Sequence, residues 1–320
     1  MNNLDIRDYK EETEEIIRKF ERKEDFVYFT SGSTGVPKKI VHSYELMKQV
    51  AEENCRYNNY TKDDYIVNAC LPAVSIGYPV LSVLPALISG CKLRTVAFNP
   101  YEYLNEMKDA THMFILPAVY RVLKKTEKWA KFDCLGKVVS SGADIVPEGI
   151  KADVISKGAK KFHHLYGSTE VPPAISNSED EKSIGWSMSD LINYYIKDNE
   201  LFIKWKGQEN FWQSGDLIDD YRNMIVTGRK KNILALNCSR IQPETIEKYV
   251  MDNTNVNRCM LTIKKDKVWM YFDGDEYPST VRETIQEWYK DSPVNVRKVY
   301  KIKLNPMNKL IRTAEYEGVS

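Results

Sequence analysis

The residues best suited to chemistry in this sequence lie in a loop at residues 30–39, which reads TSGSTGVPKK. Glycine lets backbone N–H groups come close to an anion, hydroxyl groups donate hydrogen bonds to phosphate oxygens, and lysine adds positive charge. The loop is not a Walker A motif, because Gly-Val-Pro-Lys stands where that motif requires Gly-Lys followed by Ser or Thr. A loose Ser/Gly cluster is more often a flexible turn between a strand and a helix, so the loop needs support from elsewhere in the chain.

Further short motifs follow along the sequence. Small residues form Ser141-Gly142-Ala143, and residues 166–170 (YGSTE) place an aromatic ring, hydroxyls and a carboxylate together. Residues 214–217 read SGDL, and the basic run 228–231 (GRKK) leads into Ile241, Pro243 and Glu247. Near the C-terminus, residues 308–312 read NKLIR. Any one of these carboxylates or lysines alone would more often be a solvated surface charge, so their order is what gives them weight.

The loop and the motifs, taken in this order over residues 30–312, resemble the signature motifs of the adenylate-forming superfamily. That family includes acyl-CoA synthetases, luciferase-like enzymes and the adenylation domains of peptide synthetases. In its members a carboxylate attacks the α-phosphate of ATP, which gives an acyl-adenylate and pyrophosphate, and the acyl group then passes to a thiol. The resemblance implies ATP and Mg²⁺ as cofactors, a small carboxylic acid as substrate, and CoA or phosphopantetheine as acyl acceptor.

The resemblance also assigns roles to residues that handle the phosphates. Thr169 is expected to contact the α-phosphate, and Glu170 to hold Mg²⁺ by its carboxylate. Lys309 is expected to bridge carboxylate and phosphate oxygens as a flexible point charge, which makes Lys309, Thr169 and Glu170 the predicted catalytic set. The predicted ligands of the β- and γ-phosphates are Thr30, Ser31, Gly32, Ser33, Thr34, Gly35 and Lys38.

The nucleoside has its own predicted site. One carboxylate, Asp216, can accept hydrogen bonds from both ribose hydroxyls, Arg229 can donate to the ribose, and Tyr166 is expected to stack on adenine. Lys231 matches the hinge about which the small domain of the family turns after adenylation. The full predicted set for adenine and ribose is Ser141, Gly142, Ala143, Tyr166, Gly167, Asp216 and Arg229.

Several positions depart from the family pattern. Ser75 stands where many relatives have histidine or an aromatic residue, so the acyl group does not carry over from the resemblance. Cys238 replaces a glycine in the loop that lines the thiol channel, which makes the thioester step less secure than adenylation. Asn308 replaces the glycine before Lys309, and asparagine tolerates positive φ better than most residues. The acyl pocket is expected to include Ser75, Ile76, Tyr78, His164 and Val171.

The phosphate loop begins at residue 30, whereas typical relatives carry it after a long N-terminal portion, so we expect a subdomain to be missing. The chain resembles short o-succinylbenzoate–CoA ligase-like members of the family. Apolar runs alternate with helical patterns, which predicts an α/β fold with substantial parallel sheet. The expected architecture is a large layered α/β domain at residues 1–230 and a smaller, mobile α+β domain at residues 231–320 that carries Lys309.

Local patterns predict individual elements. A one-sided helix is expected over residues 9–25, and a strand at 26–29 runs into the phosphate loop. Ser43 is expected to cap the next helix, and residues 120–129 to form another. Strands are expected at residues 200–205, and Pro243 is expected to open a helix.

Composition and charge exclude several function classes. With 46 basic and 45 acidic side chains the net charge is +1, so no global field favours nucleic acid or a membrane surface. The six cysteines show no CxxC pair, which favours reduced thiols over a zinc site. Residues 65–91 are uncharged, but Pro72, Pro79 and Pro85 interrupt them, so a buried core segment is expected rather than a membrane span. We expect a cytoplasmic protein, and the oligomeric state stays open.

Three functions remain at this stage. The leading one is an AMP-forming acid–thiol ligase of the acyl-CoA synthetase type. The second keeps adenylation but loads the acyl group onto a pantetheinylated carrier protein. The third is a nucleotide-binding relative without turnover, which the presence of Glu170, Asp216 and Lys309 disfavours.

Overall fold

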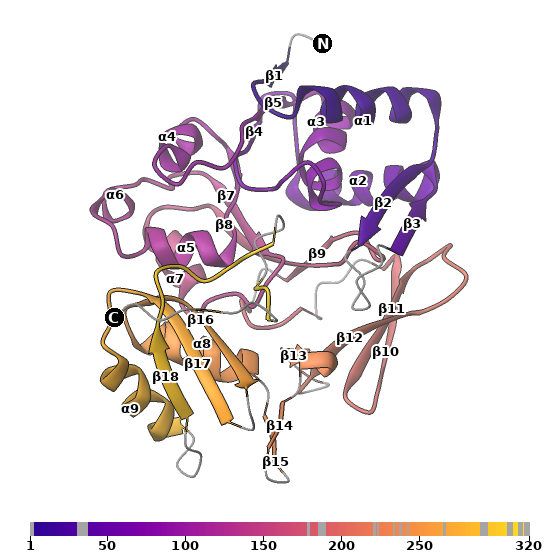
Figure 1. Cartoon of the computed structure of the whole chain (residues 1–320). Coiled ribbons are helices and arrows are strands. Elements are labelled where there is room, and N and C mark those ends of the chain that lie inside the picture. Colours follow the sequence, from indigo (N-terminus) through magenta and orange to yellow (C-terminus); the bar gives the residue numbers. More distant parts are fainter. Residues whose placement is uncertain are drawn as a thin grey trace.

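A mostly parallel sheet of seven strands forms the centre of the molecule (Figure 1). Its order is β1-β5-β4-β6-β7-β8-β9, and only β9 runs antiparallel to its neighbour. The strands are β1 Leu4–Ile6, β4 Tyr65–Asn68, β5 Lys92–Thr95, β6 His112–Phe114, β7 Val138–Gly142, β8 Lys161–Tyr166 and β9 Ala174–Asn177. The computed structural model describes residues 3–30, 38–177, 180–184, 190–219, 222, 224–232, 234–236, 239–241, 243–264, 267–288, 294–305, 310–312 and 316. The predicted α/β class is confirmed.

Helices cover the sheet from two sides (Figure 1). On one side lie α1 Lys10–Arg22, α2 Tyr44–Asn58, a π-helical turn Pro79–Val83 and α3 Leu84–Ser89. On the other lie α4 Tyr103–Met107, α5 Pro117–Leu123, α6 Glu127–Ala130 and α7 Ile150–Ser156. The hydroxyl of Ser43 accepts a hydrogen bond from the Leu46 N–H at 3.2 Å, so the predicted cap of α2 is confirmed.

One strand after the phosphate loop was not predicted: β2 Phe26–Thr30 pairs with an antiparallel strand, β3 Lys38–His42, before α2 begins. The prediction of one helix over residues 120–129 needs correction, because the structure has two helices there, α5 and α6. The chain turns between them, and Thr126 caps α6. The strand β1 was missed because its three residues are too few for a pattern of alternating apolar and polar residues to be recognised.

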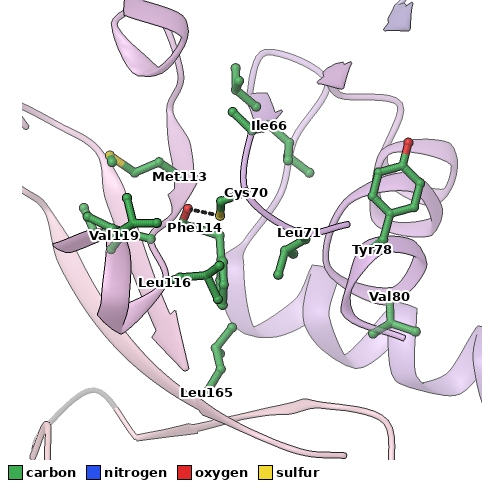
Figure 2. Packing of buried hydrophobic residues seen from close by; sticks show 14 of the residues in the cluster. Ile66, Cys70, Leu71, Tyr78, Val80, Met113, Phe114, Leu116, Val119 and Leu165 are labelled. Atoms are coloured by element: carbon green, nitrogen blue, oxygen red, sulfur yellow. Dashed lines mark hydrogen bonds between the residues drawn. The ribbon is translucent and has the colours of Figure 1, made fainter. Parts of the chain in front are cut away.

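The uncharged segment 65–91 is folded into the core, as predicted. It contributes β4, the π-helical turn and α3, and most of its side chains are buried. Figure 2 shows part of this packing, where the Cys70 thiol donates to the carbonyl oxygen of Phe114 at 2.9 Å. Among the described residues, no helix is both long enough and apolar enough to cross a bilayer.

A four-stranded antiparallel sheet follows the main sheet. Its order is β10-β11-β12-β13, and its strands are β10 Ile192–Lys197, β11 Glu200–Trp205, β12 Trp212–Ile218 and β13 Val226–Arg229. Trp205 anchors this sheet to the main one, because its buried indole N–H donates to the Pro172 carbonyl at 3.1 Å. Strand β11 has the bounds that its sequence predicts.

The chain then passes a short 3-10 turn, Lys230–Asn232, and a two-stranded hairpin, β14 Leu234–Leu236 with β15 Ser239–Ile241. The part that follows, called here the C-terminal unit (described residues from 243 to 316), contains α8 Pro243–Asn253, β16 Val256–Lys264, β17 Lys267–Gly274, α9 Pro278–Trp288 and β18 Val294–Lys298. Its side chains form hydrophobic clusters of their own, one of them centred on Val250, Met270, Phe272 and Ile285. Pro243 opens α8 as predicted, while the proposed domain boundary near residue 230 stays a prediction.

One face of the main sheet is unusually polar for a buried surface. His112, Ser140 and His163 lie on that face at neighbouring register positions. The ring of Tyr57, in α2, packs edge-on against His163 with centroids 4.8 Å apart. His163 is fully buried, and neither of its ring nitrogens has a hydrogen-bond partner in the described structure. Burial lowers the pKa of His163 to about 3, so this ring is neutral near pH 7.

The buried His163 makes the fold sensitive to acid. In the unfolded chain this imidazole takes up a proton near its ordinary pKa of 6.5, whereas the folded protein resists protonation down to about pH 3. Stability is therefore lost as pH falls between these values, at up to about 1.4 kcal/mol per pH unit for this one group. We expect His163→Leu to flatten the pH dependence of the unfolding free energy by about one proton between pH 6 and 4, measured by urea denaturation. An unchanged slope would show that His163 does not contribute.

Candidate active site

The carboxylate of Asp216 joins three of the predicted motifs. In the antiparallel pair of β12 and β13, Asp216 lies opposite Arg229, and Arg229 Nε is 2.7 Å from Asp216 Oδ1. From the end of β8, the Tyr166 hydroxyl donates to the other oxygen, Oδ2, at 2.6 Å. Asp216 is only 5% exposed. Residues far apart in the sequence thus meet around one buried charge.

The protonation of this cluster follows from its contacts. Burial, together with the negative charge of Asp216, raises the pKa of Tyr166 well above its usual value, so the phenol keeps its proton and remains a donor. The SGDL residues lie within β12 and are fixed by two hydrogen bonds. The Asp216 N–H donates to Ser214 Oγ at 2.9 Å, and Ser214 Oγ donates to the Leu201 carbonyl at 2.7 Å. Gly215 has φ +73°, a conformation that glycine adopts without strain.

The segment 166–170 is held by its backbone. His42, the last residue of β3, makes a 2.6 Å hydrogen bond from Nε2 to the Thr169 carbonyl. Gln208 donates from Nε2 to the Glu170 carbonyl at 3.3 Å. Gly167 is required by close approach, since a Cβ there would lie 2.3 Å from the Pro173 Cα. The side chains of Thr169 and Glu170 are half-buried. Because the backbone carbonyls of both residues are hydrogen-bonded, the positions of their Cα atoms are constrained.

The small-residue motif 141–143 lies at the carboxyl end of β7, beside the end of β8. A Cβ on Gly142 would lie 2.2 Å from the Leu165 carbonyl oxygen, so only glycine fits. Ala143 has φ +70°, which is uncommon for a residue with a side chain and is found most often at functional turns. In a parallel sheet, ligands bind beyond the carboxyl ends of the strands, and Ser141, Ala143 and Tyr166 all stand at that edge.

The phosphate loop is described only at its two ends. Thr30 and Lys38 are register partners at the open end of the β2–β3 hairpin, and residues 31–37 lie outside the described residues, as does the Thr30 side chain. The Lys38 ammonium lies 4.4 Å from the centroid of the Trp212 ring, a cation–π contact. Because Trp212 opens β12, the strand that carries Asp216, this contact places the end of the phosphate loop against that strand.

Other predicted residues are placed only in part. Lys309 and Cys238 lie outside the described residues, together with Ser31, Gly32, Ser33, Thr34 and Gly35. The backbone of Lys231 is in the 3-10 turn Lys230–Asn232, and its side chain is not described. Their predicted roles stay predictions.

The five residues predicted for the acyl pocket, Ser75, Ile76, Tyr78, His164 and Val171, are all buried. Tyr78 points toward α1, because its hydroxyl is 2.5 Å from Thr13 Oγ1 and its ring packs edge-on against Tyr9. His164 faces the chain at residues 181–183, and burial lowers its pKa to about 4. In Figure 2, Tyr78 lies at the right of the drawn cluster, above Val80 and opposite Met113 and Val119. These contacts give Tyr78 a packing role between α1 and the core.

Sequence reasoning missed two supports of the site. Trp212 was not singled out, although it opens β12, the strand that carries Ser214 and Asp216. Gln208 was not singled out either, and nothing in the sequence signals its bond to the Glu170 carbonyl. The role of His42 follows only from the structure, where its ring bonds to the Thr169 carbonyl.

The described residues suit an ATP·Mg²⁺ complex. No group of three or more His, Cys, Asp or Glu side chains able to hold a metal occurs in the described parts of the chain. Mg²⁺ in nucleotide sites is commonly held by one or two carboxylates together with the phosphates, and Glu170 can supply one such ligand. The Asp216 oxygens retain acceptor capacity beyond the donors they already have, so this carboxylate can also accept hydrogen bonds from a ligand.

Comparison with known proteins agrees with this arrangement. A family model described as "AMP-binding enzyme" matches residues 6–208, well over half of the chain. The chain belongs to this adenylate-forming family. A 2-succinylbenzoate–CoA ligase from Haemophilus influenzae is 22% identical over 280 residues, which covers 78% of this chain and 59% of that protein. A medium-chain fatty-acid–CoA ligase from Escherichia coli is 21% identical over 279 residues, which covers 75% of this chain and 49% of that protein.

Solved structures of the AMP-binding family share the fold. An anthranilate–CoA ligase in complex with anthranoyl-AMP superposes with a TM-score of 0.77 at 13% identity, over 90% of this chain and 66% of that one. The O-succinylbenzoate coenzyme A synthetase of Bacillus subtilis, in complex with ATP and magnesium, gives 0.73 at 18% identity, over 89% and 68%. This chain spans about half to three fifths of the length of the two curated ligases above.

The bond from His42 to Thr169 predicts a graded effect of substitution. His42→Leu removes the hydrogen bond and leaves the Thr169 carbonyl without this partner, whereas His42→Gln can keep an N–H donor. A neutral hydrogen bond contributes about 1 kcal/mol, so we expect His42→Leu to weaken ATP·Mg²⁺ binding about fivefold, with His42→Gln closer to wild type. Isothermal titration calorimetry measures both, with the melting temperature as a control for folding. Equal affinities in the Leu and Gln variants would contradict a positioning role for this bond.

Proposed function

We propose that this protein is an ATP- and Mg²⁺-dependent ligase that converts a small carboxylic acid to an acyl-adenylate and then transfers the acyl group to a thiol. The observation that carries the proposal is the cluster of Tyr166, Asp216 and Arg229 at the carboxyl edge of the parallel sheet, with Lys38 beside the same strand. This is a site for a ribose next to a site for phosphates.

The ribose would bind to Asp216 and Arg229. Each oxygen of the Asp216 carboxylate accepts one hydrogen bond within the protein, from Tyr166 or from Arg229, and a carboxylate offers about four acceptor positions in all. Acceptor capacity therefore remains for both ribose hydroxyls. Arg229 uses its Nε in the ion pair, which leaves the other guanidinium N–H groups as donors toward the sugar.

The chemical step requires two anions to approach each other. A carboxylate oxygen bonds to the α-phosphorus, the bond from phosphorus to the bridging oxygen breaks, and pyrophosphate leaves with that electron pair. Fixed cations and donors lower the barrier because they stabilise the charge that develops on the phosphoryl group. Lys38, Thr169 and the predicted Lys309 are this chain's contributors, and Glu170 would hold the Mg²⁺ that neutralises the phosphates.

A two-part architecture supports the sequence of steps. We infer a body at residues 1–230 and a second domain at residues 231–320, because the C-terminal unit has its own hydrophobic clusters. Contacts between the two include the hydrogen bond from Lys125 Nζ to the Val256 carbonyl at 2.9 Å and the long 3.8 Å ion pair of Lys248 with Glu148. Polar surface contacts of this kind suit an interface that must open, in keeping with a turn of the second domain after adenylation.

The acyl acceptor is proposed as CoA, because the two curated relatives described above are CoA ligases by name. The alternative is a pantetheinylated carrier protein. It is favoured by the likeness to a solved adenylation and carrier-protein complex holding phenylalanyl-adenylate, at a TM-score of 0.74 and 15% identity. Incubation with ATP, the acid and each acceptor, followed by intact mass measurement, separates the two.

Pyrophosphate exchange tests the adenylation step. Wild-type protein should exchange labelled pyrophosphate into ATP when the correct acid from a panel of aryl, short acyl and amino acids is present. Lys309→Ala should slow this exchange by at least about 100-fold, as is typical when a transition-state stabilising charge is lost, while ATP binding stays within a few fold. The matched control is Lys301→Ala, an exposed lysine of the same C-terminal segment.

The outcomes against the proposal are clear. Folded protein that binds ATP but exchanges no pyrophosphate with any acid would count against adenylation. Release of ADP instead of AMP and pyrophosphate would indicate a phosphotransferase. An exchange rate unchanged in Lys309→Ala would remove that lysine from the mechanism.

A further inference from the structure

We propose that Arg312 is a positioning residue that fixes the C-terminal segment to α8 and, through Glu244, to the turn that joins the two parts of the chain. The consequence would be that adenylation, but not the later thiol step, depends on this ion pair. The functional half of this inference rests on the proposed function above, whereas the anchoring itself does not.

The ion pair between Arg312 and Glu247 is two-pronged. Arg312 Nη1 is 2.7 Å from Glu247 Oε1, and Nη2 is 2.8 Å from Oε2. Glu247, in α8, is 3% exposed, and its Oε1 also accepts the Leu261 N–H at 2.7 Å. The planar fork of arginine matches a carboxylate in a way that the single ammonium of lysine cannot. The pair therefore fixes direction as well as distance.

Glu244 extends the contact toward the connecting turn. Arg312 Nη2 donates to Glu244 Oε1 at 3.2 Å, and the same oxygen accepts a hydrogen bond from Asn232 at the end of the 3-10 turn. Next to Glu244, the Thr245 hydroxyl donates to the Thr227 carbonyl of β13 at 3.2 Å. A continuous set of polar contacts thus runs from the end of β13, through the first turn of α8, to Arg312.

The segment that Arg312 holds turns back on itself. Leu304 and Leu310 form an antiparallel bridge, and the Ile311 N–H donates to the Lys303 carbonyl at 3.1 Å. Lys303 N–H in turn donates to the Tyr316 hydroxyl at 3.0 Å. Residues 306–309 lie outside the described residues, but Lys309 directly precedes Leu310 in the sequence. Fixing residues 310–312 therefore constrains where the chain on their N-terminal side can go.

The charge of Arg312 keeps the buried Glu247 carboxylate ionised. Burial raises the pKa of Glu247, and the guanidinium of Arg312 counteracts this rise, so without Arg312 the buried carboxyl would tend to take up a proton. Asp144, in the body just after the small-residue motif, also attracts Arg312 electrostatically. Arg312 therefore interacts electrostatically with Asp144 of the body while its hydrogen bonds are made within the C-terminal unit.

The position of Arg312 next to the segment that carries Lys309 predicts different effects on the two half-reactions. Adenylation needs the chain around residue 309 at the nucleotide, whereas transfer from a finished acyl-adenylate does not use that lysine in the proposed mechanism. Loss of the anchor should slow the first step and spare the second. A merely structural role would weaken both, since the shared fold would be lost.

The test compares Arg312→Gln, Arg312→Lys and Glu247→Gln with Arg297→Gln, the change of an exposed arginine on β18. In the first three we expect the kcat of pyrophosphate exchange to fall about 10-fold or more, the scale of a buried charge-assisted pair, with the KM for ATP within about twofold. Thioester formation from supplied acyl-adenylate should be unchanged, and Lys should not rescue the loss. The double variant Arg312→Gln with Glu247→Gln should be no slower than either single variant.

Hydrogen exchange gives a readout that needs no activity. Peptides covering residues 303–312 should exchange faster in Arg312→Gln than in wild type, while peptides of β16 and β17 stay protected. If protection is unchanged, the anchor does not exist and the inference is overturned. If protection is lost but both half-reactions slow equally, Arg312 is structural only. Wild-type protein without any pyrophosphate exchange would reject the proposed function, and with it the functional half of this inference, while the anchor would still be judged by hydrogen exchange.

Discussion

A single buried carboxylate organises the centre of this molecule. Asp216 accepts the Tyr166 hydroxyl from the main sheet and pairs with Arg229 from the strand that leads into the connecting turn. An unpaired charge at 5% exposure would be strongly destabilising, so both partners must be in place for the sheet of β10–β13 to dock where it does. The same arrangement leaves acceptor positions free on the carboxylate at the edge of the parallel sheet, where we propose that the ribose of ATP binds.

Further ion pairs between glutamates and basic residues lie around the connecting turn. Lys230, the residue after Arg229, pairs at 2.8 Å with Glu200 of β11, whose side chain is almost fully buried. On the far side of the turn, Glu244 and Glu247 pair with Arg312. Glu200 and Glu247 are buried and Glu244 is half-buried, and each pairs with a cation on a different segment. These ion pairs lie on both sides of residues 231–232, where the chain is proposed to turn.

Much of this could be read from the sequence, and the remainder could not for physical reasons. Ser43 and the bounds of β11 follow from local rules of capping and apolar alternation. The residues Tyr166, Asp216 and Arg229 were found through motif order. The pairing of Asp216 with Arg229 depends on the β12–β13 register, and the bond to Tyr166 joins two different sheets, neither of which short-range patterns specify. The bond from His42 to Thr169 joins residues 127 positions apart, which no local pattern can predict. The strand β3 was not recognised because its first two residues are lysines, which weaken the pattern expected of a strand.

The most direct measurement of the central claim compares ATP with 2′-deoxy-ATP and 3′-deoxy-ATP by calorimetric binding to wild type, Asp216→Asn and the exposed control Asp219→Asn. A hydrogen bond to a charged group contributes about 1.5–3 kcal/mol, so wild type and the control should bind each deoxy analogue at least about 10-fold more weakly than ATP. Asp216→Asn should bind ATP more weakly and lose most of this discrimination. Equal discrimination in Asp216→Asn and wild type would show that the ribose binds elsewhere and would contradict the account.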